Sequence, residues 1–127
     1  MIVLDASVII PGLLADGASR ALLIGDDVHV PHLADSELVH GLRASVRRGT
    51  VPAAAAGDAL ARWAALGVRR HAARRLLPRI WALRDALPAY DATYVALAEL
   101  LGCPLATGDR GIARAAGIRC AIVTPPT

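Results

Sequence analysis

Short runs of apolar residues alternate along the chain with longer segments whose apolar residues recur at helical spacing. The runs at 2–4, 28–30, 104–106 and 120–123 predict strands, and a weaker strand signal lies near 68–70. The longer segments predict helices at 7–14, 18–25, 36–48, 52–66, 72–86, 91–101 and 110–116. This alternation predicts an α/β fold: a three-layer α/β/α domain around a central, mostly parallel sheet of four to five strands.

Glycine and proline positions predict where several helices end or restart. Gly67 and Gly102 directly follow two of the helical segments, where a glycine commonly terminates a helix. Pro78 falls inside the segment 72–86, and proline is poorly tolerated in a helix interior. We therefore expect a break there, with Pro78 beginning a second helix over 78–87.

Four acidic residues fall where the predicted strands give way to helices. Asp5 comes just after the first strand, and Asp109 follows the strand at 104–106. Glu37 is expected in the first turn of the helix after the second strand, and Asp91 begins a strongly apolar helix. In parallel α/β sheets, binding sites form outside the carboxyl ends of the strands. The sequence therefore predicts that the four carboxylates share one end of the sheet.

Each acid also has a simpler explanation. A carboxylate at the start of a helix can cap free N–H groups or interact with the helix dipole, and this applies to Glu37, Asp91 and Asp109. Asp5 can cap a turn in the same way, although a carboxylate beside a buried strand is costly without compensation. As a group, four acids at one sheet end would repel each other unless a divalent cation neutralised them. Carboxylate oxygens suit Mg²⁺, with Mn²⁺ as a plausible substitute, and no Cys/His cluster has zinc spacing.

Composition narrows the class of protein further. The 127 residues are 55% hydrophobic, which fits one compact domain, and the net charge is +3. All 14 basic residues are Arg, so the chain has no phosphate-loop or Schiff-base lysine, and a phosphohydrolase of haloacid-dehalogenase type is disfavoured. Cys103 and Cys120 form no CxxC motif and are expected to be buried, reduced residues. No signal peptide or membrane span is evident, so we expect a cytoplasmic protein.

Several stretches resemble the PIN-domain ribonucleases, and in particular the VapC toxins of VapBC toxin–antitoxin pairs. The matching segments are IVLDASVII, PHLADSELVHGLR, AYDATYVALAELLGCPLATGD and RGIARAAG, in the same order and over nearly the whole chain. The resemblance implies that residues 1–127 form a single PIN domain. It implies that Asp5, Glu37, Asp91 and Asp109 are the catalytic acids, which bind one or two metal ions.

The resemblance also implies an activity. A metal-activated water would cleave RNA phosphodiester bonds and leave a 3′-hydroxyl and a 5′-phosphate. Ser7 and Thr107 correspond to hydroxyls near the site and are candidates to hold water or phosphate, although turn capping explains them equally well. Arg43 and Arg84 are the candidate substrate contacts among the basic residues; a solvated helix face is the alternative.

The expected partners are an RNA substrate and a cognate VapB-type antitoxin, whose helix would lie in an apolar groove near 36–48 and 52–66. A homodimer and a toxin–antitoxin hetero-oligomer are also expected, with promoter DNA bound only through the antitoxin. The four His residues are expected to be structural or at the surface, and base stacking on aromatic residues is not predicted. The alternative function is a non-catalytic PIN-fold module that binds RNA or protein.

Overall fold

A computed structural model describes residues 1–25 and 27–126, and its five strands form one parallel sheet. The strands are β1 (Ile2–Leu4), β2 (Val28–Pro31), β3 (Arg69–His71), β4 (Leu105–Ala106) and β5 (Ile122–Val123). Their order across the sheet is β3-β2-β1-β4-β5, and every neighbouring pair is parallel. The predicted fold class is confirmed, with a strand in each of the five places where the apolar pattern indicated one.

Helices connect the strands, close to the predicted ranges. They are α1 (Ala6–Leu14), α2 (Ala18–Gly25), α3 (Leu33–Arg47), α4 (Ala53–Ala65), α5 (Leu77–Ala82), α6 (Ala89–Leu101) and α7 (Arg110–Arg114), with a 3-10 turn at Arg74–Leu76. Gly102 ends α6 in the left-handed conformation, with φ of 65°. This conformation is one that glycine adopts without steric cost.

Two helix boundaries differ from the prediction. The helix α3 begins at Leu33 rather than near residue 36, because Leu33 and Ala34 already pack on the core, so Glu37 lies in its second turn and not its first. Pro78 does stand at the start of α5, as expected, but α5 ends at Ala82 instead of residue 87. Turns follow α5, and they still bury Leu83 and Leu87 against the core.

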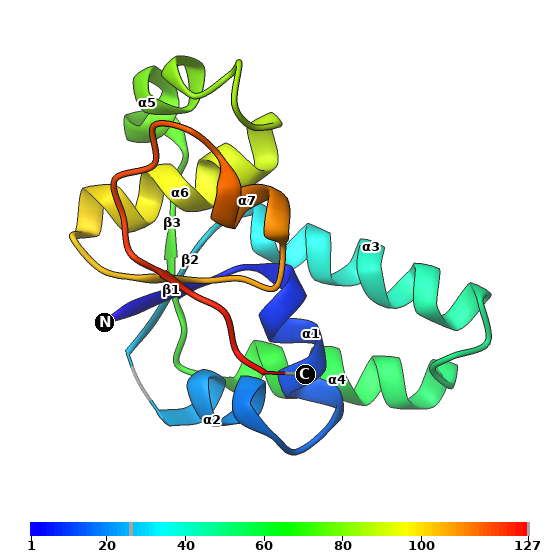
Figure 1. Cartoon of the computed structure of the whole chain (residues 1–127). Helices are drawn as coiled ribbons and strands as arrows, with labels where there is room; N and C mark the ends of the chain where they lie inside the picture. The colour runs from blue at the N-terminus through cyan, green and yellow to red at the C-terminus, as the bar shows by residue number, and fades with distance from the viewer. Residues whose placement is uncertain (26, 127) are drawn as a thin grey trace.

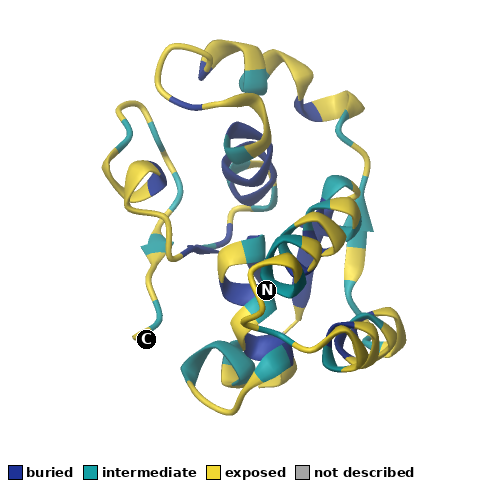
Figure 2. Ribbon diagram, turned by 90° about the vertical axis from the view of Figure 1, so that its right-hand side faces the viewer, coloured by how far each residue is buried: buried dark blue, intermediate teal, exposed yellow. Residues whose placement is uncertain are grey.

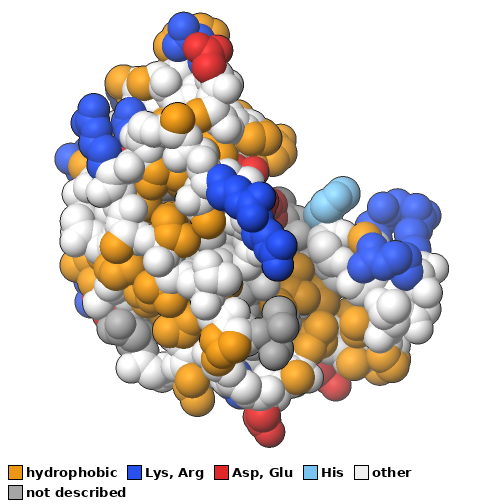
Figure 3. Space-filling view, viewed as in Figure 1, with side chains coloured by type: hydrophobic (Ala, Val, Ile, Leu, Met, Phe, Trp, Pro, Cys, Tyr) orange, Lys and Arg blue, Asp and Glu red, His pale blue; other side chains and the backbone are white. Residues whose placement is uncertain are grey.

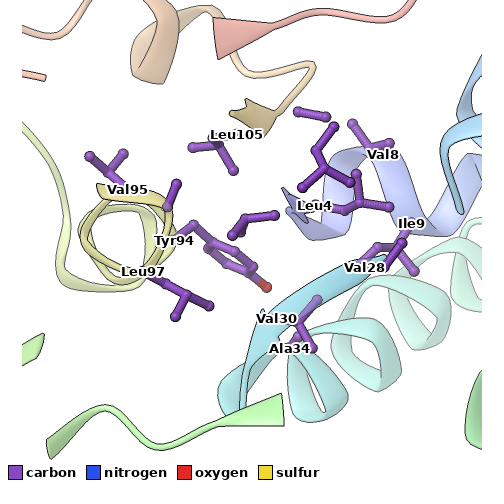
Figure 4. Packing of buried hydrophobic residues seen from close by; sticks show 14 of the residues in the cluster. Leu4, Val8, Ile9, Val28, Val30, Ala34, Tyr94, Val95, Leu97 and Leu105 are labelled. Carbon is purple, nitrogen blue, oxygen red and sulfur yellow. The ribbon is translucent and has the colours of Figure 1, made fainter. Parts of the chain in front are cut away.

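The sheet is covered on both faces (Figure 1). The helices α1, α2, α3 and α4 pack against one another on one side, and α6 contacts β1, β2 and β4 on the other, with α5 outside it. Figure 2 shows the middle of α6 buried, in agreement with the seven consecutive buried residues at 92–98. The core between α6, the sheet and α1 consists mainly of Leu, Val, Ile and Ala side chains, with Tyr94 among them (Figure 4).

The strand order creates a switch point in the middle of the sheet. From β1 the chain builds outward to β2 and β3 on one side, and later to β4 and β5 on the other. The connections on the two sides of β1 therefore diverge at its carboxyl end, where open α/β sheets place their binding crevice. Leu4 pairs with Ala106, so the residues that follow them, Asp5 and Thr107, emerge side by side at this point.

No single helix in the described part of the chain is long and apolar enough to cross a membrane. The helices α1 and α2 reach the required length and composition only when taken together, and they meet at an angle of 100°. Cys103 is buried, as expected, whereas Cys120 is only half-buried, and the two cysteines form no disulfide with each other.

Candidate functional site

Asp5 stands at the centre of the candidate site and is held by three hydrogen bonds. Its Oδ1 accepts from the backbone N–H of Ser7 at 3.0 Å and from Ser7 Oγ at 2.5 Å. Its Oδ2 accepts from Thr107 Oγ1 at 2.5 Å. Asp5 is therefore the N-cap of α1, as the simpler explanation held, but the hydrogen bond from Thr107 comes from a different strand.

Burial is the largest influence on the Asp5 carboxyl. It raises the pKa of Asp5 above its usual value, and the hydrogen bonds from Ser7 and Thr107 offset part of that rise. Only 5% of the residue is exposed. An acid so well enclosed is costly to ionise, and a cation at the site would lower that cost.

The loop after β4 is tied to the start of α1 through the same hydroxyls. The backbone N–H of Gly108 donates to Ser7 Oγ at 2.8 Å, and that of Asp109 donates to Thr107 Oγ1 at 2.9 Å. Asp109 itself caps α7 by accepting from the N–H of Gly111 at 2.7 Å. Ser7 and Thr107 thus both bond to Asp5 and hold the turn that carries Asp109.

Glu37 and Tyr94 face each other below this cluster. Glu37 Oε1 and Tyr94 Oη are both buried, and within the described residues neither has a hydrogen-bond partner of good geometry. Burial, followed by the charge of Glu37, raises the pKa of Tyr94 above its ordinary value. In Figure 4 the Tyr94 hydroxyl points from α6 toward the junction of β2 and α3, near Val30 and Ala34. Glu37 lies one turn further along that helix.

The four acids are electrostatic neighbours. Burial is the main cause that raises the pKa of Glu37, and the negative charges of Asp91 and Asp5 raise it further. Burial likewise raises the pKa of Asp91, with further contributions from Asp109 and Asp5. Residues that lie far apart along the chain are thus brought together at the carboxyl ends of β1 and β4. Neither Glu37 nor Asp91 caps its helix, so capping does not explain these two.

The chemistry of this donor set suits a hard divalent cation. All four side chains offer carboxylate oxygens, and one Glu37 oxygen is buried beside Tyr94. No three His, Cys, Asp or Glu side chains among residues 1–25 and 27–126 converge on one point where they could hold an ion as they stand. Coordination by several of these acids at once therefore requires some side-chain movement toward a common position.

The two candidate arginines lie outside the acidic cluster. Arg43 is exposed and lines a groove between α3 and α4. The guanidinium of Arg84 stacks over the Trp81 ring, 4.6 Å from its centroid, and donates to the Trp81 carbonyl at 3.0 Å. Several other arginines of the basic tract are engaged in ion pairs: Arg69 with Asp27, Arg70 with Asp35, and Arg79 with Glu99.

Two aromatic residues lie at the candidate site although neither was among the site residues predicted from the sequence. Tyr94 faces the acids from inside the core. Its position one helical turn after Asp91 was the sequence feature that indicated its closeness to the site. Tyr90 directly precedes Asp91 and is 68% exposed. It lines a cavity together with Leu33, Ser36, Glu37 and His40. No feature of the sequence distinguished this exposed tyrosine from a core aromatic residue.

Comparison with known proteins agrees with the geometry. Residues 2–118 match the model of the PIN domain. The chain is 44% identical over 126 residues to the VapC ribonuclease Mb0985 of Mycobacterium bovis, an alignment that covers 99% of each protein.

Solved structures also share the fold. The protein PAE2754 of Pyrobaculum aerophilum superposes with a TM-score of 0.69 at 27% identity, over 95% of this chain and 81% of that one. The structure of VapBC2 from Rickettsia felis bound to a DNA fragment from its promoter contains a chain with a TM-score of 0.71. Its 13% identity, over 99% of this chain and 100% of that one, indicates the fold alone.

Proposed function

The chain belongs to the PIN-domain family, and from this premise we propose that it is a metal-dependent endoribonuclease that acts as the toxin of a toxin–antitoxin pair. Its substrate is RNA, and residues 1–127 act as one PIN domain. The name of the Mycobacterium bovis relative, a VapC ribonuclease, supports the activity. We also propose that it acts in the cytoplasm, where its RNA substrate and its antitoxin would be present.

One observation carries the proposal. Burial raises the pKa values of Asp5, Glu37 and Asp91. The negative charges of neighbouring acids raise the pKa further for Glu37, which faces Asp91 and Asp5, and for Asp91, which faces Asp109 and Asp5. Clusters of perturbed acids at a sheet switch point are characteristic of functional sites. A purely structural protein would gain nothing from this concentration of like charge.

Asp5, Glu37, Asp91 and Asp109 would hold one or two Mg²⁺ or Mn²⁺ ions. When bound, such an ion supplies positive charge at the scissile phosphate and makes a bound water more acidic. Hydrogen bonds from Ser7 to Oδ1 and from Thr107 to Oδ2 fix the orientation of the Asp5 carboxylate for this role. Glu37, which lines the adjoining cavity and faces Asp5 and Asp91, would accept a hydrogen bond from the attacking water. Loss of the 3′ oxygen from phosphorus then leaves a 3′-hydroxyl and a 5′-phosphate.

A VapB-type antitoxin is the proposed inhibitor, and α3 and α4 offer it a docking groove. The groove is a cavity of about 430 Å³ with a mainly apolar lining that includes Val39, Leu42, Val46, Ala56 and Leu60. Val39 is 50% exposed, as expected of a side chain that a helix would cover. The VapBC2 structure, which is bound to promoter DNA, is the model for a toxin–antitoxin hetero-oligomer in which the antitoxin binds the DNA. We also propose a toxin homodimer.

Cleavage of RNA by purified protein tests the proposal directly. We expect single-stranded RNA to be cut in Mg²⁺ or Mn²⁺, to survive in EDTA, and to be cut again when metal is restored. Asp91→Asn should reduce the rate at least 100-fold while it leaves the thermal unfolding temperature unchanged or higher, because it removes one of several facing negative charges.

The control variant is Asp16→Asn. Asp16 is 94% exposed at its side chain and pairs only with Arg20 within the described residues, so full activity is expected. Cleavage that is equal in wild type and Asp91→Asn would indicate a contaminating nuclease and reject the site. Intact RNA with all metals, together with no Mn²⁺ binding in calorimetry, would favour the non-catalytic binding module instead.

A further inference from the structure

A cavity of about 520 Å³ opens beside the acid cluster, between α3 and the start of α6. Leu33, Ser36, Glu37 and His40 line it from α3, and Tyr90 lines it from α6. The α3 residues follow one another at helical spacing and form a single stripe on that helix. Figure 3 shows the molecule hollowed near the start of α3, with acidic and His side chains at the edge of the hollow.

The cavity is continuous with the candidate site through two residues. Glu37 belongs both to the cavity lining and to the group of four acids. Tyr90 is followed directly by Asp91 in the first turn of α6. A nucleotide whose phosphate lies at the acids would therefore have its neighbouring base within reach of this cavity.

Tyr90 has a free aromatic face. It is 68% exposed and forms no hydrogen bond or ring contact with any other described residue. Trp81, which is 69% exposed, differs because the Arg84 guanidinium already covers its ring. A single exposed tyrosine needs no explanation. This one, however, stands at the mouth of a cavity that also holds an apolar side chain, Leu33, and two hydrogen-bonding ones, Ser36 and His40.

We infer that this cavity is a nucleobase subsite, in which Tyr90 stacks on the base next to the scissile phosphate while Ser36 and His40 hydrogen-bond to its edge. The inference rests on the proposed ribonuclease function and specifies how that site recognises its substrate. Single-stranded RNA is commonly read in this way, with an unstacked base against an aromatic ring and polar groups at its edge. The carboxylate of Glu37 would repel a negatively charged phosphate in this cavity, but it would not repel a neutral base. The strand ends, α3 and α6 place the acids, while the cavity decides which nucleotide is presented to them.

Fluorescence of 2-aminopurine tests stacking without the need for cleavage. The probe is a single-stranded RNA of eight nucleotides with 2-aminopurine at each position in turn, bound to the Asp109→Asn protein so that it stays intact. Fluorescence should be quenched at one position on binding. Adding Tyr90→Ala should abolish that quenching and weaken binding about tenfold, whereas Tyr90→Phe should preserve both, since the ring is retained.

Leu100→Ala is the matched control, because Leu100 is 52% exposed near the other end of α6. It should leave quenching and affinity unchanged, and all variants should unfold at the wild-type temperature. Wild-type protein cleaving a pool of random-sequence RNA should show a base preference at the same position. Ser36→Ala and His40→Ala should relax that preference, with His40→Asn restoring part of it.

The two proposals fail in different ways. RNA that binds with Tyr90-dependent quenching but is never cut supports the subsite and rejects the nuclease. RNA that is cut equally well by Tyr90→Ala, with unchanged preference and unchanged quenching, rejects the subsite and leaves the nuclease intact. The subsite is also rejected if no RNA binds, or if Tyr90→Ala weakens only the binding of an antitoxin.

Discussion

Thr107 Oγ1 donates a 2.5 Å hydrogen bond to Asp5 Oδ2, although the two residues are 102 positions apart in the chain. Both are buried, with exposures of 0% for Thr107 and 5% for Asp5. The parallel pairing of β1 with β4 brings them together. Because Thr107 is fully enclosed, we expect it to act at the site by orienting Asp5 and not by contacting RNA directly.

Replacing Thr107 with Val tests this orienting role. The substitution keeps the shape of the side chain but removes the hydroxyl that bonds to a buried carboxylate, so we expect a loss of about 1–3 kcal/mol of stability. Loss of a group that orients a metal ligand typically lowers metal affinity or activity about 10- to 100-fold. Calorimetric titration with Mn²⁺ and the rate of RNA cleavage measure the two effects.

Thr93→Val provides the comparison. Thr93 is also buried, and its Oγ1 donates to the Ala89 carbonyl within α6, so the same chemical change is made without touching Asp5. We expect Mn²⁺ affinity close to wild type there. Equal affinity losses in the two variants would mean that general destabilisation, and not the orientation of Asp5, explains the Thr107 result.

Asp35 and Glu37 lie two residues apart on α3, and we expect Asp35 to stabilise the fold and Glu37 to act in cleavage. Asp35 accepts a hydrogen bond from Trp63 Nε1 at 2.7 Å and pairs with Arg70, Oδ2 to Nε at 2.9 Å. We expect Asp35→Ala to cost about 1–3 kcal/mol, because it leaves the indole N–H of the buried Trp63 without an acceptor, and to leave Mn²⁺ binding unchanged. Glu37→Gln should do the reverse, with stability kept or raised and cleavage reduced at least 100-fold.

Urea unfolding and cleavage rates measured on both variants separate the two roles. Glu37→Gln has a favourable effect on stability because it removes a charge that faces Asp91 and Asp5. A destabilised Glu37→Gln that cleaves RNA normally would assign Glu37 to the fold and remove it from the site.

Arg79 is expected to stabilise the fold and not to bind RNA. Its Nε donates to Glu99 Oε1 at 2.6 Å and its Nη2 to the Gly117 carbonyl at 2.6 Å, which links α5, α6 and the turn before β5. Arg79→Gln should therefore lower the free energy of unfolding by about 1–3 kcal/mol and leave the salt dependence of RNA binding unchanged. A reduced salt dependence at normal stability would instead make Arg79 a phosphate contact.

The strands, and the end of the sheet at which Asp5 and Asp109 lie, could be predicted from sequence because they depend on local patterns. The strand order, and with it the switch point, was not predicted. An apolar run such as Ile2–Leu4 specifies a strand buried on both faces, and the acid that follows it then has only one end of the sheet to occupy. Asp5 and Asp109 were placed correctly beside their strands for that reason. The roles of the four acids as metal ligands remain predictions.

The ion pairs of individual arginines could not be predicted from the sequence, because each acidic partner is distant in the chain. Arg70 meets Asp35 across 35 residues, and Arg79 meets Glu99 across 20. Only the folded packing shows that these members of the basic tract are already paired. The start of α3 was also misjudged, since burial of Leu33 extends the helix where its polar composition did not indicate one.

Two histidines form a pH-sensitive contact at the other side of the sheet. His29 Nδ1 and His71 Nε2 are 2.8 Å apart, and His29 Nε2 lies 2.9 Å from Asp27 Oδ2. One of the two facing nitrogens must donate and the other accept, which requires at least one neutral ring. Arg69 and His32 also face this group and add positive charge.

Acidification should therefore weaken the β2–β3 edge. Burial first, and then the charges of His29 and His32, lowers the pKa of His71 below the unfolded value of 6.5. The neutral ring is thus favoured in the folded protein: its contribution to stability is complete above pH 6.5 and is lost as the pH falls through the folded pKa. Urea unfolding between pH 7.5 and 5.5 should show this loss in wild type and in His40→Asn, but much less of it in His71→Gln, which cannot take up the proton. An equal loss in all three proteins would assign the effect to other groups.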